Sequence, residues 1–242
     1  MITSTWMTTS DGTRINKWLS EMGVCSRRQA DRLIVQQQVQ VNGQSATLGM
    51  LIAQNDEVKV GGELISQRPA AQYILYYKPV GVVCTHQLSV KDNLEQALNF
   101  PERVFAVGRL DRASEGLLLL SNQGEIVNKI MRAEHKQPKK YYVWVDKPVT
   151  AGFIEQMSQG VEILGQTTLA CEVEYIGERQ FAITLVQGLN RQIRRMCQTL
   201  GYKVERLQRV QIMHLTSDAL PPGSYRQLTD IEIAQLYAAI DY

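Results

Sequence analysis

The sequence lacks the features that mark several large classes of protein. Its four cysteines are far apart and form no Cys-x-x-Cys pair, so neither a zinc site nor a disulfide framework is indicated. No uncharged apolar run is long enough to cross a bilayer, and residues 1–10 do not have the pattern of a secretion signal. We therefore expect a cytoplasmic protein with free thiols, no metal and no membrane association.

An excess of positive charge is also missing from the chain as a whole. Lys and Arg total 26 against 24 acidic residues, a net charge of +2. The cations are nevertheless clustered: residues 129–147 hold six Lys or Arg against two acids, and residues 191–211 hold six against one. Runs of this kind can steer a polyanion into a cleft.

The chain has 242 residues, of which 44% are hydrophobic. That is enough apolar material for one sizeable core and a small additional domain. The polar stretch 67–72 includes Pro69, which disfavours helix just before it and is typical of a linker. We therefore predict two domains, residues 12–68 and residues 73–242.

The first domain is predicted to hold two helices and a small sheet. Apolar residues recur at helical spacing from Arg14 to Met22, and Ser26 followed by Gln29 is a capping-box pattern that opens a second helix. Asn42-Gly43 is a strong signal for a tight turn between short strands.

The second domain carries more strands than helices, and the two do not alternate regularly. The strands are predicted at 73–77, 81–85, 117–121, 141–145, 170–175, 180–186 and 203–212, and the helices at 93–98, 125–131, 151–159, 191–200 and 231–240. This order favours an α+β fold with a large mixed, mainly antiparallel sheet flanked by helices over a doubly wound sheet.

Several basic residues lie on or beside the first two predicted helices: Arg14, Lys17, Arg27 and Arg28. They could form an ordinary solvated surface, or they could place charge against phosphates. The strings RINKWL (14–19), CSRRQAD (25–31) and VQVNG (39–43) resemble the S4 RNA-binding domain. That resemblance implies that this domain docks structured RNA through these four side chains.

Asp111 stands in a loop bounded by glycines, in the string GRLDRASEGL (108–117). A lone Asp at such a place could merely cap a turn. The whole string, however, resembles the catalytic motif of the RNA pseudouridine synthases. The resemblance implies that Asp111 is the nucleophile. A stacked target base must be flipped into the pocket, and our hypothesis is that Arg109 or Arg112, beside the motif, occupies the vacated space or grips the RNA backbone.

Two further strings agree with that family. Residues 139–143, KKYYV, resemble its Lys-x-Tyr element, which identifies Tyr141 as the active-site tyrosine; neighbouring strand residues face opposite ways, so Tyr142 would point elsewhere. Either ring could instead be a core aromatic with its hydroxyl at the surface. By resemblance, Tyr141 accepts the proton lost from C5.

The third string is LVQGLNRQIRRMC (185–197). Asn190 is expected to cap a helix whose apolar stripe is buried, leaving a basic face that could be merely solvated. The string resembles the family motif in which an arginine pairs with the catalytic aspartate. That role would fall to Arg194, holding Asp111 ionised, while Ile193 would support the floor of the pocket.

The resemblance covers residues 14–242 and, among subfamilies, is greatest to the large-subunit ribosomal RNA synthases that join an S4 module to this core. It implies isomerisation of a uridine in structured RNA, a reaction that needs no cofactor. Small-subunit ribosomal RNA or a transfer RNA stem-loop would be alternative substrates. A monomer is the default expectation.

Two other readings remain open on the sequence. One is a noncatalytic RNA-binding or ribosome-assembly protein, for which the Asp111 carboxylate would be dispensable. The other is a hydrolase that uses Asp111 with a histidine, although His86, His135 and His214 belong to no acid-base motif.

Overall fold

The computed structural model describes residues 12–87, 89–131, 137–217 and 220–240, so His135 and the basic residues at 132 and 136 lie outside the described part. The chain divides into two compact units between Ala71 and Gln72. All four cysteines are free thiols. Within the described ranges, no helix combines the length and the apolar character needed to span a bilayer.

The first unit is a pair of helices beside short strands. Its elements are β1 (Thr13–Arg14), α1 (Ile15–Glu21), α2 (Arg27–Val35), β2 (Val39–Val41), β3 (Gln44–Ser45), β4 (Leu51–Ile52), β5 (Val58–Val60) and β6 (Glu63–Leu64). The Oγ of Ser26 accepts a hydrogen bond from the backbone N–H of Gln29 at 3.1 Å, which caps α2 as the sequence predicts. Asn42 and Gly43 both have positive φ, as the tight turn between β2 and β3 requires.

The second unit is built on one large sheet. Its strands are β7 (Tyr73–Lys78), β8 (Phe105–Val107), β9 (Glu115–Ser121), β10 (Lys139–Val145), β13 (Glu172–Gly177), β14 (Gln180–Leu185), β15 (Val204–Ile212), β16 (Leu215–Thr216) and β17 (Tyr225–Gln227), with a separate hairpin of β11 (Glu162–Ile163) and β12 (Gln166–Thr167). Its helices are α3 (Leu94–Leu98), α4 (Gly124–Met131), α5 (Ala151–Gln159), α6 (Gln192–Thr199) and α7 (Asp230–Ala238).

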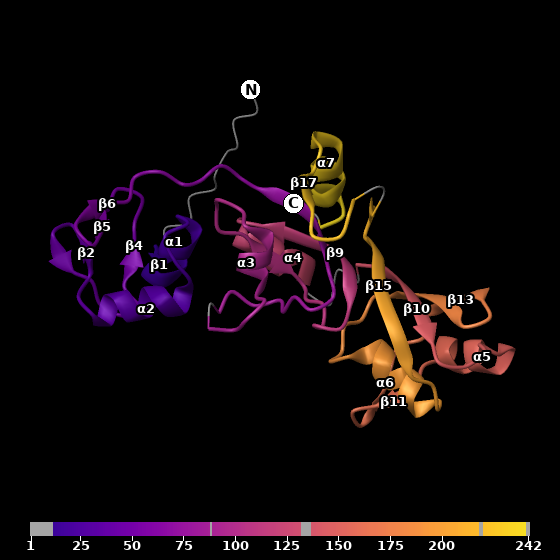
Figure 1. Ribbon diagram of the computed structural model, residues 1–242. Coiled ribbons are helices and arrows are strands. Elements are labelled where there is room, and N and C mark those ends of the chain that lie inside the picture. The colour runs from indigo at the N-terminus through magenta and orange to yellow at the C-terminus, as the bar shows by residue number, and fades with distance from the viewer. Residues whose placement is uncertain (1–11, 88, 132–136, 218–219, 241–242) are drawn as a thin grey trace. The chain divides into compact units, whose positions relative to one another are not determined.

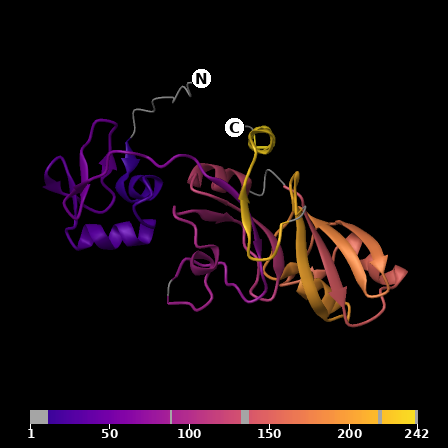
Figure 2. The same cartoon turned by 45° about the horizontal axis from the view of Figure 1, so that its top comes forward.

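The large sheet consists of two antiparallel lobes joined by a parallel seam. The strand order is β13-β14-β10-β15-β9-β7-β17, with β16 beside β15 and β8 beside β9. The seam is the pairing of β15 with β9, where Gln208 lies opposite Glu115 and Arg209 opposite Gly116. The first lobe comprises β7, β8, β9 and β17, and the second comprises β10, β13, β14, β15 and β16 (Figures 1 and 2).

A single row of residues crosses the seam and defines one face of the sheet. Ile183, Tyr141, Arg209, Gly116 and Lys78 are consecutive cross-strand partners on β14, β10, β15, β9 and β7. We call the side on which this row stands the site face. Because side chains alternate along a strand, every second residue on each strand shares that face, apart from local shifts at bulges.

Helices cover both faces of the sheet. On the site face, α5 and α6 bury the second lobe, where Phe153, Met157, Ile193 and Met196 pack against strand residues, and α3 buries the first lobe through Leu94. On the opposite face, α4 and α7 cover the first lobe. In Figure 1, α5 and α6 lie at the β10–β15 end and α7 lies near β17.

The α+β fold with a large, mainly antiparallel sheet is confirmed. Two local predictions are wrong. Residues 81–85 form no strand but an isolated bridge between Val83 and Asn93, because Gly81 has a φ of +96° that ends the extended chain. Asn190 does not cap α6; Arg191 takes that position in the left-handed region, and Asn190 accepts two hydrogen bonds from Arg195 instead.

Candidate active site

Asp111 lies in the loop that joins β8 to β9. Its backbone carbonyl accepts a hydrogen bond from Ser114 N at 3.0 Å, which closes a turn. The side chain is half-buried, and within the described residues its carboxylate forms no hydrogen bond or ion pair. Backbone atoms therefore close this turn, and the carboxylate takes no part in it.

The loop around Asp111 is fastened to the neighbouring segment 81–92. Leu110 N donates to Cys84 Sγ at 3.5 Å, and Gly81 N donates to Arg112 O at 2.8 Å. The Arg112 side chain returns to the same segment, with Nε on Gly81 O at 3.0 Å and Nη2 on Asp92 at 3.2 Å. Arg112 thus has structural partners that compete with the expected contact to RNA.

Arg109 contrasts with Arg112. It is exposed, and its side chain forms no hydrogen bond or ion pair with any residue that the structure describes. A cation placed two residues before Asp111 with no internal partner is available to a polyanion or to a vacated base position.

Tyr141 stands on the site face of β10. It packs against the core cluster of the second lobe, and its hydroxyl has no hydrogen-bond partner within the described ranges. Tyr142 faces the other way and meets the edge of Trp144, with ring centroids 6.5 Å apart. The alternation that selects Tyr141 from the pair is therefore observed. Two strand spacings of about 4.8 Å separate Tyr141 from Gly116, so it lies about 10 Å from the start of β9.

Arg194 reaches from α6 across to the Asp111 loop. Its Nη2 donates to Ala113 O at 2.9 Å and to Ser114 Oγ at 3.2 Å, and its Nη1 donates to Val204 O at 3.2 Å. Among the described residues, no ion pair joins it to Asp111. Burial lowers the pKa of Arg194, while the Asp111 charge opposes that shift. Arg194 therefore supports the loop directly, and the charge of Asp111 acts on its guanidinium through space.

Ile193, the neighbour of Arg194 on α6, is almost fully buried. It belongs to the second-lobe core beneath Tyr141 rather than to an open surface. Its expected role as the floor of a pocket stays a prediction.

Two buried cations stand in the row that crosses the seam, and the sequence did not single out either. Lys78 is fully buried and its Nζ donates to the carbonyls of Pro79 and Val82. Burial lowers the Lys78 pKa, and the charges of Asp111 and Glu115 partly offset this. Lys78 directly follows the apolar run 73–77, which was the available signal.

Arg209 is the second of these cations, with 1% of its surface exposed. Its Nε donates to Leu117 O at 2.7 Å, and its Nη2 has no partner within the described residues. It stands near Lys139, whose pKa is lowered to about 8 by burial and by the Arg209 charge. The sequence places Arg209 in the basic run 191–211 that is expected to attract RNA, but the structure places the side chain in the interior.

The four basic residues predicted to bind RNA in the first unit lie at its surface. Arg14, Arg27 and Arg28 are exposed, and Lys17 forms an ion pair with Glu21 at 3.4 Å. Arg27 and Arg28 occupy the first turn of α2, which contains no acidic residue. Cations there oppose the helix dipole, so the helix gains no stability from them.

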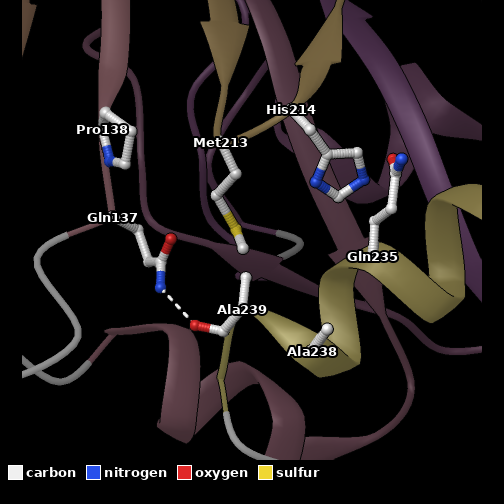
Figure 3. Close-up of a pocket in the computed structure, with 7 residues that line it drawn as sticks. All are labelled: Gln137, Pro138, Met213, His214, Gln235, Ala238 and Ala239. Carbon is white, nitrogen blue, oxygen red and sulfur yellow. Dashed lines mark hydrogen bonds between the residues drawn. The ribbon is translucent and has the colours of Figure 1, made fainter.

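A pocket of about 480 Å³ lies elsewhere in the second unit, beside α7 (Figure 3). Its lining includes Met213, His214 and Ala238, and Gln137 Nε2 donates to Ala239 O across it at 2.8 Å. Among the residues that the structure describes, its lining contains no carboxylate and none of the predicted site residues. This pocket is therefore not the place where the sequence predicts the chemistry, which is at the groups around the seam.

Comparison with known proteins gives consistent results for both units. Residues 72–199 match the family model described as RNA pseudouridylate synthase, and residues 13–58 match the S4 domain. Dual-specificity RNA pseudouridine synthase RluF of Escherichia coli is 48% identical over 230 residues, covering 94% of this chain and 79% of its own length. Ribosomal large subunit pseudouridine synthase B of Bacillus subtilis is 33% identical over 238 residues, covering 95% and 97%.

A solved structure of a pseudouridylate synthase superposes with a TM-score of 0.68 at 29% identity, covering 92% of this chain and 99% of its own. The similarity therefore extends through both units and to the three-dimensional fold.

Proposed function

We propose that Asp111 is the catalytic nucleophile of this chain, which belongs to the RNA pseudouridine synthases that carry an N-terminal S4 domain. The chain isomerises uridine in RNA to pseudouridine. The observation that carries the assignment is the Asp111 carboxylate, which bonds to no residue that the structure describes and stands in a loop that Arg194 holds through Ala113 O and Ser114 Oγ.

The reaction is an isomerisation: one glycosidic bond is broken and another is formed, and no group is added. The bond from C1′ to N1 of uracil breaks, the base turns, C5 joins C1′, and the proton leaves C5 while N1 gains one. Asp111 acts at the sugar, either by attacking C1′ or by removing a sugar proton to give a glycal. Both routes require an ionised carboxylate, and two cations, Lys78 and Arg194, lie close enough for the Asp111 charge to raise their own pKa values against the effect of burial.

Tyr141 is our candidate for the group that accepts the C5 proton and stacks on the uracil. Its hydroxyl is free of internal partners among the described residues, so it can engage the base. Because a tyrosine is a weak base, transfer through it needs a bound-state partner or a relay. Ile193 belongs to the core cluster against which this ring packs, and in this proposal it supports the floor of the pocket.

Entry of the uridine requires that it leave its stack. Arg109, which has no internal partner in the described structure, is better placed to occupy the vacated position than Arg112, whose guanidinium is bonded to Gly81 and Asp92. Arg14, Lys17, Arg27 and Arg28 of the S4 unit hold the RNA backbone in this proposal.

We propose large-subunit ribosomal RNA as the substrate, in the cytoplasm, with a monomeric chain divided into domains 12–68 and 73–242. The name of the B. subtilis relative supports the ribosomal large subunit. The word "dual-specificity" in the name of the E. coli relative favours a second RNA, for which a transfer RNA stem-loop is our candidate.

The test of the nucleophile is tritium release from RNA labelled at C5 of uridine. Wild type should release tritium, and Asp111→Asn should release none while binding the same RNA with similar affinity. Pseudouridine mapping in cellular RNA with and without the chain would identify the substrates. Undiminished release by Asp111→Asn would rule out the assignment and favour a different catalytic group.

A further inference from the structure

The proposed catalytic groups come from different lobes of the sheet. Asp111 belongs to the first lobe, through the loop before β9, whereas Tyr141 and Arg194 belong to the second, on β10 and α6. The two lobes meet at the seam, whose backbone pairing is limited to two residue pairs. So short a ladder is a weak constraint on the relative placement of the lobes.

Side chains on the face opposite the site reinforce this seam. Arg206 on β15 donates from Nε to Glu115 on β9, and its guanidinium lies 4.4 Å above the Trp144 ring centroid. Gln208 donates to Tyr77 Oη at 2.9 Å, and that hydroxyl donates to the second Glu115 oxygen at 3.2 Å. We call Tyr77, Glu115, Trp144, Arg206 and Gln208 the back-face network.

The start of β9 is thus held from both faces of the sheet. Arg194 binds Ala113 O and Ser114 Oγ from the site face, and Arg206 binds Glu115 from the back. The next residue, Gly116, approaches the Arg209 backbone so closely that a Cβ would come within 2.2 Å of Arg209 O. These interactions lie two to five residues after Asp111 and fix where its loop ends.

We propose that Glu115 and Arg206 are positioning residues that hold the Asp111 loop in place against Tyr141 and Arg194. They act from the back of the sheet without touching RNA. This inference rests on the proposed function. Stability alone does not account for the pair, because an ion pair with an arginine half exposed to solvent contributes little to folding. Small misplacements of reacting groups, by contrast, reduce rates strongly.

The experiment compares single-turnover tritium release at saturating RNA for wild type, Arg206→Gln, Glu115→Gln, the double variant and Arg206→Lys. We expect each Gln variant to slow release about 10-fold with unchanged RNA affinity. The double variant should be no slower than either single variant, because both disrupt one interaction. Arg206→Lys should restore part of the rate by keeping the charge.

Arg179→Gln is the matched control. Arg179 is an exposed arginine in the turn between β13 and β14 of the second lobe, and its side chain bonds to no residue that the structure describes. Thermal melting of every variant measures whether the fold is retained. We expect it to be retained, because Arg206 is half-exposed and because Glu115→Gln preserves the shape of the side chain.

Three outcomes would overturn the inference while wild type remains active. The first is that Arg206→Gln turns over as fast as Arg179→Gln. The second is that the rate reductions of Arg206→Gln and Glu115→Gln multiply in the double variant, and the third is that these changes alter RNA affinity and not the rate. A wild-type chain that releases no tritium would instead overturn the proposed function, and this inference with it.

Discussion

At the scale of single residues, Gly116 shows how tightly the site is built. Its φ is +108°, and a Cβ would lie 2.2 Å from Arg209 O and 2.7 Å from Arg209 N. Both atoms are backbone at the seam, so they cannot move aside as a flexible side chain could. We expect Gly116→Ala to lower the free energy of unfolding by more than about 1 kcal/mol.

Urea denaturation measures that effect, with Gly124→Ala as its control. Gly124 begins α4 and has no atom near its would-be Cβ, so alanine there should leave stability unchanged or raise it by about 0.4–1 kcal/mol. Equal unfolding midpoints for the two variants would contradict the close approach at the seam.

The adjacent tyrosines provide a second residue-scale prediction. Tyr141→Phe removes the hydroxyl proposed to take the C5 proton, whereas Tyr142→Phe changes a ring that meets Trp144 on the opposite face. We expect tritium release to fall at least about 100-fold in Tyr141→Phe, in the range typical of a lost acid-base group. Tyr142→Phe should stay within a few-fold of wild type, and the reverse order would refute the assignment.

The sequence predicts Asp111, Tyr141 and Arg194 as the central groups because each stands in a recognisable string. It does not identify Lys78 or Arg209 as interior. Charged side chains are almost never fully buried without partners, so a pattern of charges reads as surface by default. Their burial depends on the pairing of β7, β9 and β15, which are far apart in the chain.

At the scale of elements, long apolar strands and well-capped helices are predictable, whereas short pairings are not. The apolar runs that became β7 and β9, and the Ser26 cap of α2, carry local signals. Pairs such as β11 with β12 contain two residues per strand and depend on tertiary contacts. The apolar pair at 82–83 suggested a strand, but Val82 packs into a core from a loop.

The N-terminus of α7 supports a prediction on pH. Thr229 and Glu232 form a capping box, and hydrogen bonds from Arg226 lower the Glu232 pKa to about 2. Because the folded pKa lies below the ordinary value of 4.5, this carboxylate stabilises the fold at pH above about 5. That contribution is lost as the pH falls toward 2.

We therefore expect Glu232→Gln to cost about 1 kcal/mol at pH 7 and much less at pH 3. Urea midpoints of wild type, Glu232→Gln and the exposed control Glu178→Gln at the two pH values measure this. A cost of Glu232→Gln that is the same at both would contradict the linkage.

At the scale of the whole molecule, the small net charge does not show that the basic residues have different roles: some are structural, and others lie at the surface. The run 191–211 suggested a continuous RNA track, but Arg209 is buried and Arg206 is bound to Glu115. Positive charge in the second unit therefore serves the seam as well as the surface. We therefore expect the S4 unit to supply a larger share of the positive charge that binds RNA.

The first turn of α2 allows that share to be measured. Arg27 and Arg28 are exposed beside the positive end of the helix dipole, where cations are unfavourable by about 0.3–1 kcal/mol each. Replacing both with Gln should leave stability equal or slightly higher. RNA binding should weaken, and the slope of log K against log salt should shrink by roughly 0.7–0.9 for each phosphate that the protein no longer neutralises.

Lys59→Gln is the control, since Lys59 lies on β5 and is already paired with Glu57 at 2.8 Å. It should leave the salt slope unchanged. The two explanations for Arg27 and Arg28 predict different results. If these residues serve the fold, replacing them lowers stability. If they serve RNA binding, replacing them lowers RNA affinity and not stability. A double variant that unfolds more easily and binds RNA with an unaltered salt slope would refute the proposed role of this surface.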